Sequence, residues 1–339
     1  KDFKITAKES GGITQHIGAY EVEHNGKKIT FIDTPGHEAF SAMRLRGASV
    51  ADVALLVVDS AQSVQPQTKE AIATIKSAGI PMIAVLNKID LPNANPQKIK
   101  GELSKADVVV ESMGGEVPSV EVSAKEKTGI DELLEMILLV AEMQDLASDI
   151  TVPAQGLVIE SYMDALKGPV ATVIVERGIL RLKDIIATDL ALAKVRALLD
   201  FNGKTINEVL PSQPAIVLGF EKVPGVGEKF TSFKTAEEAQ GKLKTQLDKK
   251  EINYSNAPVA DPNKKLLNII LKSDVFGSLE AIDGMIKSLP SNQVVLKILK
   301  SEVGDINEAD VKLAETTGAE IVGFRVKINA GVMQLMKND

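Results

Sequence analysis

The sequence predicts a multi-domain α/β protein in which a small β-barrel separates two α/β units. Residues 1–150 and 264–339 alternate short apolar runs with stretches of helical periodicity, as doubly wound domains do. Residues 151–235 instead hold short β-branched runs separated by Gly, Pro and Asn, which is typical of a small barrel. A chain of 339 residues is also longer than one hydrophobic core usually serves. We therefore expect these three domains, with a linker helix and loop at 236–263.

The first unit is expected to contain a parallel sheet covered by helices on both faces. Strands are expected, in chain order, at Lys28–Ile32, Val53–Val58, Pro81–Leu86 and Ser119–Val122. Apolar side chains at helical spacing predict helices at Thr68–Ala78 and Ile130–Met143. Fully apolar strands suit a sheet that is buried on both faces. Because ligands of such sheets bind beyond the carboxyl ends of the strands, the polar residues after each strand are the first candidates for a site.

The remaining chain predicts the barrel, the linker and the second α/β domain. Barrel strands are expected at Gly156–Glu160, Val170–Val175, Val195–Leu199 and Ala215–Gly219. The Asn-Gly pair within Phe201–Lys204 predicts a hairpin turn, because Asn and Gly tolerate positive φ at both central positions. A charged run of helix formers predicts a helix at Thr235–Lys250. Strand and helix then alternate through Leu266–Leu271, Gly277–Leu289, Val294–Leu299, Ile306–Thr317 and Glu320–Val326.

Composition limits the kind of function. A net charge of −7 argues against a protein that coats nucleic acid through bulk charge. With no Trp and 4% aromatic residues, a stacking platform for single strands is not expected. The absence of Cys excludes disulfides, thiolate zinc sites and cysteine nucleophiles, and it fits a reducing compartment such as the cytoplasm. The longest apolar run, Leu133–Val140, is interrupted by Glu135, so no membrane span is expected.

The most specific signal is the cluster Asn87-Lys88-Ile89-Asp90 at the end of a buried strand. The Asp90 carboxylate can accept hydrogen bonds from N1–H and the exocyclic amine of guanine, a donor pair that adenine lacks. Asn87 can bond the N7 edge of that base, and the aliphatic stem of Lys88 can lie along its face. The alternative is an ordinary polar turn, which Asn, Asp and the following Pro92 also favour.

A second cluster ends the first strand and consists of Asp33, Thr34, Pro35, Gly36 and His37. Asp33 suits a water-mediated contact to Mg²⁺, which keeps most of its waters. Gly36 leaves room for its backbone N–H to approach a phosphate, and His37 can orient a water for in-line attack on that phosphate. The alternative is a plain strand-to-helix turn, with Asp or Thr as the N-cap and Pro at the first helical position.

Two weaker signals complete the set. Ser123-Ala124-Lys125 ends the fourth strand, where the Ala124 N–H can donate to guanine O6, a position at which adenine presents a donor. Thr14 lies in a Gly-rich loop ahead of the first strand, where its hydroxyl and carbonyl can serve Mg²⁺ and a terminal phosphate. The four signals occur in the order, and at the strand ends, that a guanine-nucleotide switch requires.

On these motifs the chain resembles bacterial-type translation initiation factor 2, a family of translational GTPases. The similarity covers nearly the whole chain and includes Gly11–Gly18, Asp33–Phe40, Pro66–Ile72, Asn87–Asp90, Val175–Gly178 and Leu271–Ser278. The resemblance implies that residues 1–150 form a P-loop-NTPase-like G domain. It further implies that Thr14 is the switch I threonine, that the Asp33 cluster belongs to switch II, and that His37 positions the attacking water.

The resemblance also implies the rest of the site and its partners. The guanine base would be bound by Asn87, Lys88 and Asp90, and enclosed by Ser123, Ala124 and Lys125. The expected cofactors are GTP or GDP and Mg²⁺, with metal contacts from Thr14 and Asp33. The expected activity is GTP hydrolysis stimulated by the ribosome as its small and large subunits join. The family places initiator tRNA on the small subunit, through a barrel that would lie beyond residue 339. A monomer in the cytoplasm is expected.

Two departures from the family pattern matter. The 339 residues contain no Gly-x-x-x-x-Gly-Lys-[Ser/Thr] motif, which supplies the backbone cradle, the phosphate Lys and the Mg²⁺ hydroxyl. The G domain is therefore expected to be incomplete and this chain to bind GTP poorly. The sequence also stops before the family's last barrel, so we expect a fragment. The alternatives are a non-enzymatic ribosome-binding scaffold or degenerate GTPase, and an elongation-type factor.

Overall fold

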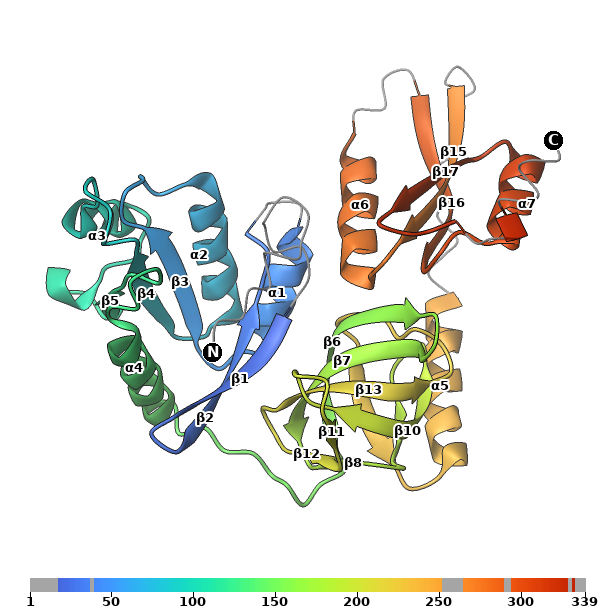
Figure 1. Ribbon diagram of the computed structural model, residues 1–339, viewed down its shortest axis with the longest axis horizontal. Coiled ribbons are helices and arrows are strands. Elements are labelled where there is room, and N and C mark those ends of the chain that lie inside the picture. The colour runs from blue at the N-terminus through green and yellow to red at the C-terminus, as the bar shows by residue number, and fades with distance from the viewer. Residues whose placement is uncertain (1–17, 37–39, 252–264, 290–293, 329–330, 333–339) are drawn as a thin grey trace. The chain divides into compact units, whose positions relative to one another are not determined.

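The computed structural model describes residues 18–36, 40–251, 265–289, 294–328 and 331–332 (Figure 1). The chain divides into two compact units, one of residues 23–147 and the other of residues 148–339 with 1–22. Among the described helices, none is both long and apolar enough to span a membrane. The predicted multi-domain α/β class is confirmed, because α/β elements occur before and after a β-barrel.

The first α/β domain, which comprises the unit of residues 23–147 and the start of β1 (Gly18–His24), is built on two separate sheets. β1 and β2 (Lys27–Asp33) pair as a hairpin across the Asn25-Gly26 turn. The other sheet is parallel and has the order β3 (Ala54–Asp59), β4 (Met82–Asn87) and β5 (Ser119–Glu121). The helices are α1 (Ser41–Val50), α2 (Pro66–Ala78), α3 (Pro96–Lys105), the short η4 (Glu111–Met113) and α4 (Ile130–Met143).

The parallel sheet is covered on both faces, as its apolar strands require. On one face β3 and β4 pack with α2 and α3 through a cluster that includes Leu56, Leu86, Ile72 and Ile99. On the other face β4 and β5 pack with α4 through Ile83, Val85, Val120, Ile137 and Val140. Alternate residues of β4 thus enter opposite cores, because successive side chains of a strand point to opposite faces.

One edge of this sheet stays open in the described structure. β2 and β3 are consecutive strands, yet they belong to different sheets. Val57 on β3 is 57% exposed, whereas Leu56 and Val58 on either side of it are 3% and 4% exposed. A parallel strand is normally covered on both faces. The open edge fits the lack of a phosphate-loop motif, because the strand and helix that such a loop joins would belong to the core of the sheet.

The barrel follows in the second unit. Its sheet has the order β11-β10-β13-β7-β6-β14-β9 and closes through a further β9–β10 pairing. The strands are β6 (Gln155–Asp164), β7 (Gly168–Arg177), β9 (Ile185–Ala187), β10 (Leu192–Leu199), β11 (Thr205–Ile206), β13 (Pro214–Phe220) and β14 (Lys229–Phe233), with β8 (Leu180–Arg181) and β12 (Glu208–Val209) forming a small separate pair. The buried core includes Val158, Val173, Val195, Val217 and Phe230.

The predicted hairpin turn is present, and it uses positive φ at one of its two central positions. Leu199 pairs with Thr205, so five residues connect β10 to β11. Positive φ occurs at Gly203 (80°) and not at Asn202. The Asp200 carboxylate accepts hydrogen bonds from the backbone N–H groups of Asn202 (2.9 Å) and Lys204 (2.8 Å), and this longer loop needs only one left-handed residue.

A helix and a small parallel sheet complete the chain. The helix α5 (Ala236–Glu251) packs on the barrel, where Ala239 is buried with Ala187 and Leu192. The predicted linker loop at 253–263 lies outside the described residues. The second α/β domain contains β15 (Lys265–Ser273), α6 (Phe276–Ser288), β16 (Val294–Val303), α7 (Glu308–Thr317) and β17 (Glu320–Phe324), with the sheet order β16-β15-β17.

Candidate functional site

The carboxyl ends of β3, β4 and β5 meet at one edge of the parallel sheet. Asp59, the last residue of β3, is in register with Asn87, the last residue of β4. The chain after β5 continues beside β4, because the Val122 N–H donates to the Leu86 carbonyl at 2.8 Å. In the reverse direction the Ile89 N–H donates to the Val122 carbonyl at 3.3 Å. The turns after β4 and β5 are therefore held side by side.

Asn87 joins these two turns through its side chain. Its Oδ1 accepts hydrogen bonds from the backbone N–H of Lys88 at 2.7 Å and of Ala124 at 3.1 Å. Lys88 has a φ of 64°, a left-handed conformation that side-chain-bearing residues adopt at a cost. The sequence predicts that the Ala124 N–H faces a base directly, but in the structure this group already donates to Asn87. A base carbonyl at this position would share that donor.

Asp90 and Ser123 form the second link between the turns. The buried Ser123 hydroxyl donates to Asp90 Oδ1 at 2.6 Å and accepts from the Glu126 N–H at 3.1 Å. This hydroxyl, aided by the charges of Lys125 and Lys88, holds the pKa of the exposed Asp90 carboxyl below its ordinary value. Asp90 is therefore ionised at neutral pH, and its carboxylate can accept further hydrogen bonds from a ligand.

Asp59 fixes the side chain of Lys88. Lys88 Nζ lies 2.7 Å from Asp59 Oδ2, and the other carboxylate oxygen accepts the Ala61 N–H at 2.8 Å. The hydrogen bond from Lys88 lowers the pKa of Asp59. Asp59 is not among the site residues predicted from the sequence, although its place directly after a buried strand is an available signal. Its contact to Lys88 depends on the β3–β4 register, which the sequence does not contain.

The turn after β2 belongs to the other sheet of the domain. In it Pro35 is buried and Gly36 is exposed. Arg44 on α1 donates to the Pro35 carbonyl at 3.0 Å and pairs with Glu70 on α2. Pro35 and Gly36 are not helical and α1 begins only at Ser41, so the alternative of a helix that starts at Pro35 is wrong.

The structure brings together some of the predicted residues and leaves others undescribed. Asn87, Lys88, Asp90, Ser123 and Ala124 are connected by hydrogen bonds. Lys125 lies exposed beside them and pairs with Glu126 at 3.4 Å. Asp33 is the last residue of β2 in the hairpin sheet, and Thr34, Pro35 and Gly36 follow it. Thr14 and His37 lie outside the described residues.

The donor set suits Mg²⁺ better than a metal that needs a protein cage. Within the part of the chain that the structure describes, no group of three or more His, Cys, Asp or Glu side chains could hold a metal ion. Mg²⁺ does not require such a group, because it is usually bound through one or two protein oxygens, phosphates and several waters. Asp33, at the end of β2, fits a contact of that kind.

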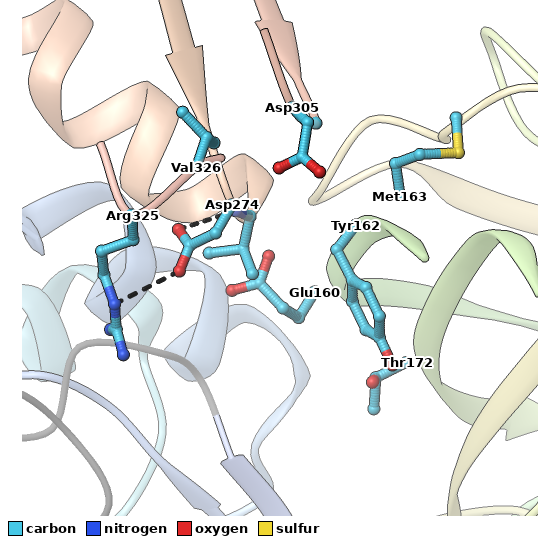
Figure 2. A pocket seen from close by; sticks show the side chains of 10 residues that line it. Glu160, Tyr162, Met163, Thr172, Asp274, Asp305, Arg325 and Val326 are labelled. Carbon is cyan, nitrogen blue, oxygen red and sulfur yellow. Dashed lines mark hydrogen bonds and ion pairs between the residues drawn. The ribbon is translucent and has the colours of Figure 1, made fainter. Parts of the chain in front are cut away.

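A cavity of about 440 Å³ lies elsewhere, where the barrel meets the second α/β domain (Figure 2). Its carboxylates have structural partners. Asp274 pairs with Arg325 at 3.5 Å, and Asp305 accepts the Lys327 N–H at 2.9 Å. Glu160 accepts the Gly277 N–H at 3.3 Å. The Glu160 contact joins β6 to the start of α6, whereas the other two interactions lie within the second α/β domain, and we assign the cavity to this joint.

Three family models match the chain in succession. The Elongation factor Tu GTP binding domain matches residues 3–143, Elongation factor G domain 2 matches residues 153–233, and Translation-initiation factor 2 matches residues 241–339. Domain by domain, the chain is therefore similar to translational GTP-binding factors.

Over almost its whole length the chain is similar to proteins named translation initiation factor IF-2. It is 45% identical to IF-2 of Carboxydothermus hydrogenoformans, with 100% of the chain and 42% of the relative covered. It is 44% identical to the chloroplastic IF-2 of Euglena gracilis (98% and 43% covered) and 45% identical to IF-2 of a Thermoanaerobacter species (100% and 51% covered). These relatives confirm the resemblance inferred from the motifs, and the chain spans about half of their length.

Solved structures agree on the fold. The GDP-bound aIF5B from Aeropyrum pernix superposes with a TM-score of 0.57 at 24% identity, with 99% of this chain and 66% of that chain covered. The bacterial selenocysteine-specific elongation factor EF-Sec gives a TM-score of 0.53 at 22% identity, with 67% and 40% covered. The arrangement of an α/β domain, a barrel and further elements is thus shared with translational factors.

Proposed function

We propose that the chain is the central part of a translation initiation factor of the IF-2 type, a switch that binds GTP and GDP. The observation that supports this function most is the hydrogen-bonded cluster of Asn87, Asp90, Ser123 and Ala124 at the carboxyl edge of the sheet. In the whole protein, GTP would be hydrolysed in response to the ribosome. The similarity of the entire chain to IF-2 proteins supports the choice of initiation over elongation.

The proposed base specificity follows from charge and donor pattern. An ionised Asp90 accepts from N1–H and from the exocyclic amine of guanine. The amide nitrogen of Asn87 is a donor, and the guanine N7 and O6 are acceptors. Adenine would leave the Asp90 carboxylate without its two donors, and it would present its 6-amino group towards the Ala124 N–H. Both mismatches leave polar groups without partners in the bound state, which disfavours adenine.

The phosphate half of the site is assigned to the turn after β2 and to residues on either side of it. Asp33 would contact Mg²⁺ through water, Gly36 would donate its N–H to the terminal phosphate, and His37 would orient the attacking water. Thr14 would complete the Mg²⁺ and phosphate contacts. A phosphate loop would come from another part of the protein, and its strand would occupy the open edge of β3. We therefore expect the 339-residue chain alone to bind GTP weakly.

The proposed partners are both ribosomal subunits, together with initiator tRNA bound by a part of the protein that is not in this chain. The proposed location is the cytoplasm, and the proposed state is a monomer. A non-enzymatic scaffold or degenerate GTPase is the second candidate, and the lack of a phosphate-loop motif is the observation that favours it. This candidate requires that a full-length protein containing the chain binds ribosomes without hydrolysing GTP.

The test is multiple-turnover GTP hydrolysis by a full-length protein that contains this chain, with and without ribosomes. Replacing His37 with Ala is expected to lower the ribosome-stimulated kcat by about 100-fold or more, the usual share of a positioned acid–base group. The matched control is His24→Ala, which changes the same residue type in the β1–β2 hairpin. Equal rates for the His37→Ala and wild-type proteins would remove His37 from this role. No stimulation of the wild-type protein would favour the scaffold.

A further inference from the structure

We propose that Arg44 is a positioning residue for the step that senses the terminal phosphate of GTP. It would act by fixing the orientation of the Pro35–Gly36 peptide group. This inference rests on the proposed GTPase function and names a residue for it that the sequence motifs do not include. Arg44 lies on α1, eight residues beyond Gly36 in the sequence.

The contacts of Arg44 are specific and buried. Its side chain is 8% exposed, and Nη1 donates to the Pro35 carbonyl oxygen at 3.0 Å. Nη2 of the same guanidinium pairs with Glu70 on α2. A charged side chain pays a desolvation cost when it is buried, and these two contacts offset part of that cost. The planar fork of the guanidinium makes both contacts from one rigid group.

A second contact presses α1 against the same turn. Gly47 lies three residues after Arg44, so the two residues are neighbours on the surface of the helix. A Cβ atom placed on Gly47 would lie 2.9 Å from Cγ2 of Thr34, which is closer than such atoms normally approach. The backbone of α1 thus lies directly against Thr34, while Arg44 donates to the carbonyl of the next residue, Pro35. Helix α1 therefore contacts the turn at two adjacent residues, Thr34 and Pro35, and fixes the position of the turn.

The consequence for the ligand follows from peptide geometry. The Pro35 carbonyl and the Gly36 N–H belong to one planar peptide group, and the described chain contains no cis peptide bonds. In a trans peptide the C=O and N–H bonds point in opposite directions. A hydrogen bond that holds the Pro35 oxygen towards α1 therefore directs the Gly36 N–H away from α1. This N–H is the donor proposed for the terminal phosphate, and Gly36 is exposed.

This geometry separates GTP from GDP. GDP lacks the terminal phosphate, so its affinity does not depend on the direction of the Gly36 N–H. The base contacts of Asn87 and Asp90 are made by the turns after β4 and β5, and they are likewise independent of Arg44. Loss of the Arg44 contact should therefore weaken GTP relative to GDP and slow hydrolysis, while GDP binding is preserved. A merely structural role would weaken both nucleotides together.

The experiment uses the full-length protein that contains this chain, in four forms: wild type, Arg44→Ala, Arg44→Lys and Glu70→Gln. The dissociation constants of GDP and of a non-hydrolysable GTP analogue are measured by calorimetry, and kcat and KM of GTP hydrolysis are measured on ribosomes. For Arg44→Ala we expect the GTP-to-GDP affinity ratio and kcat to fall about tenfold or more, the scale of losing one oriented donor. The dissociation constant of GDP should stay within about twofold.

The conservative variants and the control show whether Arg44 positions the Pro35–Gly36 peptide group or only stabilises the packing of α1. An ammonium lacks the planar fork of a guanidinium and cannot hold both acceptors in one fixed geometry, so Arg44→Lys should restore only part of the lost discrimination. Glu70→Gln should lose less than Arg44→Ala, because the contact to the Pro35 carbonyl remains. Arg46→Lys is the matched control, because Arg46 is similarly buried on the same helix at 9% exposure. It should behave as wild type.

Several outcomes would overturn the role of Arg44. These are an unchanged affinity ratio and kcat in Arg44→Ala, an equal loss of GDP and GTP binding in Arg44→Lys, or an equal effect of Arg46→Lys. Thermal unfolding followed by circular dichroism accompanies each variant. If Arg44→Ala is unfolded, the affinity ratios of Arg44→Lys and Glu70→Gln decide the question instead. A wild-type protein that neither binds GDP nor hydrolyses GTP would refute the proposed function itself, which is a different result.

Discussion

At the scale of single residues, the candidate base site is assembled by side chains that orient one another. Ser123 is 1% exposed and donates a hydrogen bond to Asp90. Asn87 accepts hydrogen bonds from the backbone N–H groups of Lys88 and Ala124, which lie in the two turns of the site. Asp59 holds the ammonium of Lys88, so the side chain of Lys88 is tethered at its end. These contacts restrict the side chains of the site among themselves, which lowers the cost of ordering them around a ligand.

Exchanging Asp90 for Asn should change which base is preferred. The amide would place a donor opposite the exocyclic amine of guanine, and GDP affinity should fall by more than about tenfold, since bonds to charged groups contribute about 1.5–3 kcal/mol. Xanthine has a carbonyl in place of that amine, so xanthosine diphosphate should bind better to Asp90→Asn than to the wild type. Calorimetry on the full-length protein measures both affinities.

The control for this exchange is Asp107→Asn, which makes the same chemical change at an exposed position after α3. It should leave both affinities unchanged. A preference for GDP over xanthosine diphosphate that survives in Asp90→Asn would show that Asp90 does not contact the base.

At the scale of secondary-structure elements, the sequence predicts those elements whose burial follows a simple period. The helix predicted at Ile130–Met143 has the same bounds as α4, because α4 buries a regular apolar stripe. The spacing of apolar residues does not predict α1. Two of the four buried residues of this helix are Arg44 and Arg46, so its buried face has no apolar period. It also misses α3, although Asn95 as N-cap and Pro96 at the first position are available signals.

The same distinction applies to the candidate site. Asn87, Asp90 and Ser123 can be named from the sequence because each follows an apolar strand and belongs to a known pattern. Arg44 and Glu70 cannot, because their importance lies in a contact between α1, α2 and the turn after β2. Such a contact depends on how the helices pack, and the spacing of residues in the sequence does not predict it.

A buried ion network in the second α/β domain makes this element sensitive to acid. Asp310 on α7 is 0% exposed; its oxygens lie 2.7 Å from Lys300 Nζ and 3.2 Å from Lys272 Nζ. Burial by itself raises the pKa of Asp310, but the hydrogen bonds from Lys300, from the Asn307 N–H and from Lys272 outweigh it, and the pKa lies below its ordinary value. A lowered pKa in the folded state means that the carboxylate stabilises the fold above its unfolded pKa.

We therefore expect the stability of this domain to fall as the pH drops below about 4, the ordinary pKa of Asp. Asp310→Asn should cost about 2 kcal/mol at pH 7, because it removes charge-assisted hydrogen bonds to Lys272 and Lys300, which keep Glu302 as a carboxylate partner. It should also flatten the acid dependence. Urea titrations at pH 7, 5 and 3, followed by pulsed hydrogen exchange in β15, measure both effects.

Glu308→Gln serves as the control, since Glu308 is an exposed carboxylate in the first turn of the same helix. It should keep the acid dependence of the wild type. Parallel loss of stability in wild type and Asp310→Asn between pH 7 and pH 3 would contradict the assignment.

At the scale of the whole molecule, the barrel and the second α/β domain are joined by a buried carboxylate. Glu160 on β6 is 5% exposed and accepts the N–H of Gly277, in the first turn of α6. Tyr162 on the same strand pairs with Val275 through an isolated bridge. The N-terminus of a helix carries partial positive charge and unpaired N–H groups, so an anion from the barrel stabilises it.

Glu160→Gln should loosen this joint, because the amide can still accept a hydrogen bond but no longer brings a negative charge to the helix N-terminus. Exchange of the Gly277 amide hydrogen should become about fivefold faster, which corresponds to about 1 kcal/mol. Asp283→Asn, the same change further along α6, is the control and should leave that amide unchanged. Identical Gly277 exchange in wild type and Glu160→Gln would refute this role of Glu160.

The central claim is that the turns after β4 and β5 together form a pocket that prefers guanine. The most direct test is calorimetric titration of a full-length protein containing this chain with GDP and with ADP. Two charge-assisted hydrogen bonds to Asp90 predict that GDP binds at least about 100-fold more tightly than ADP. Equal affinities for the two nucleotides would contradict the account.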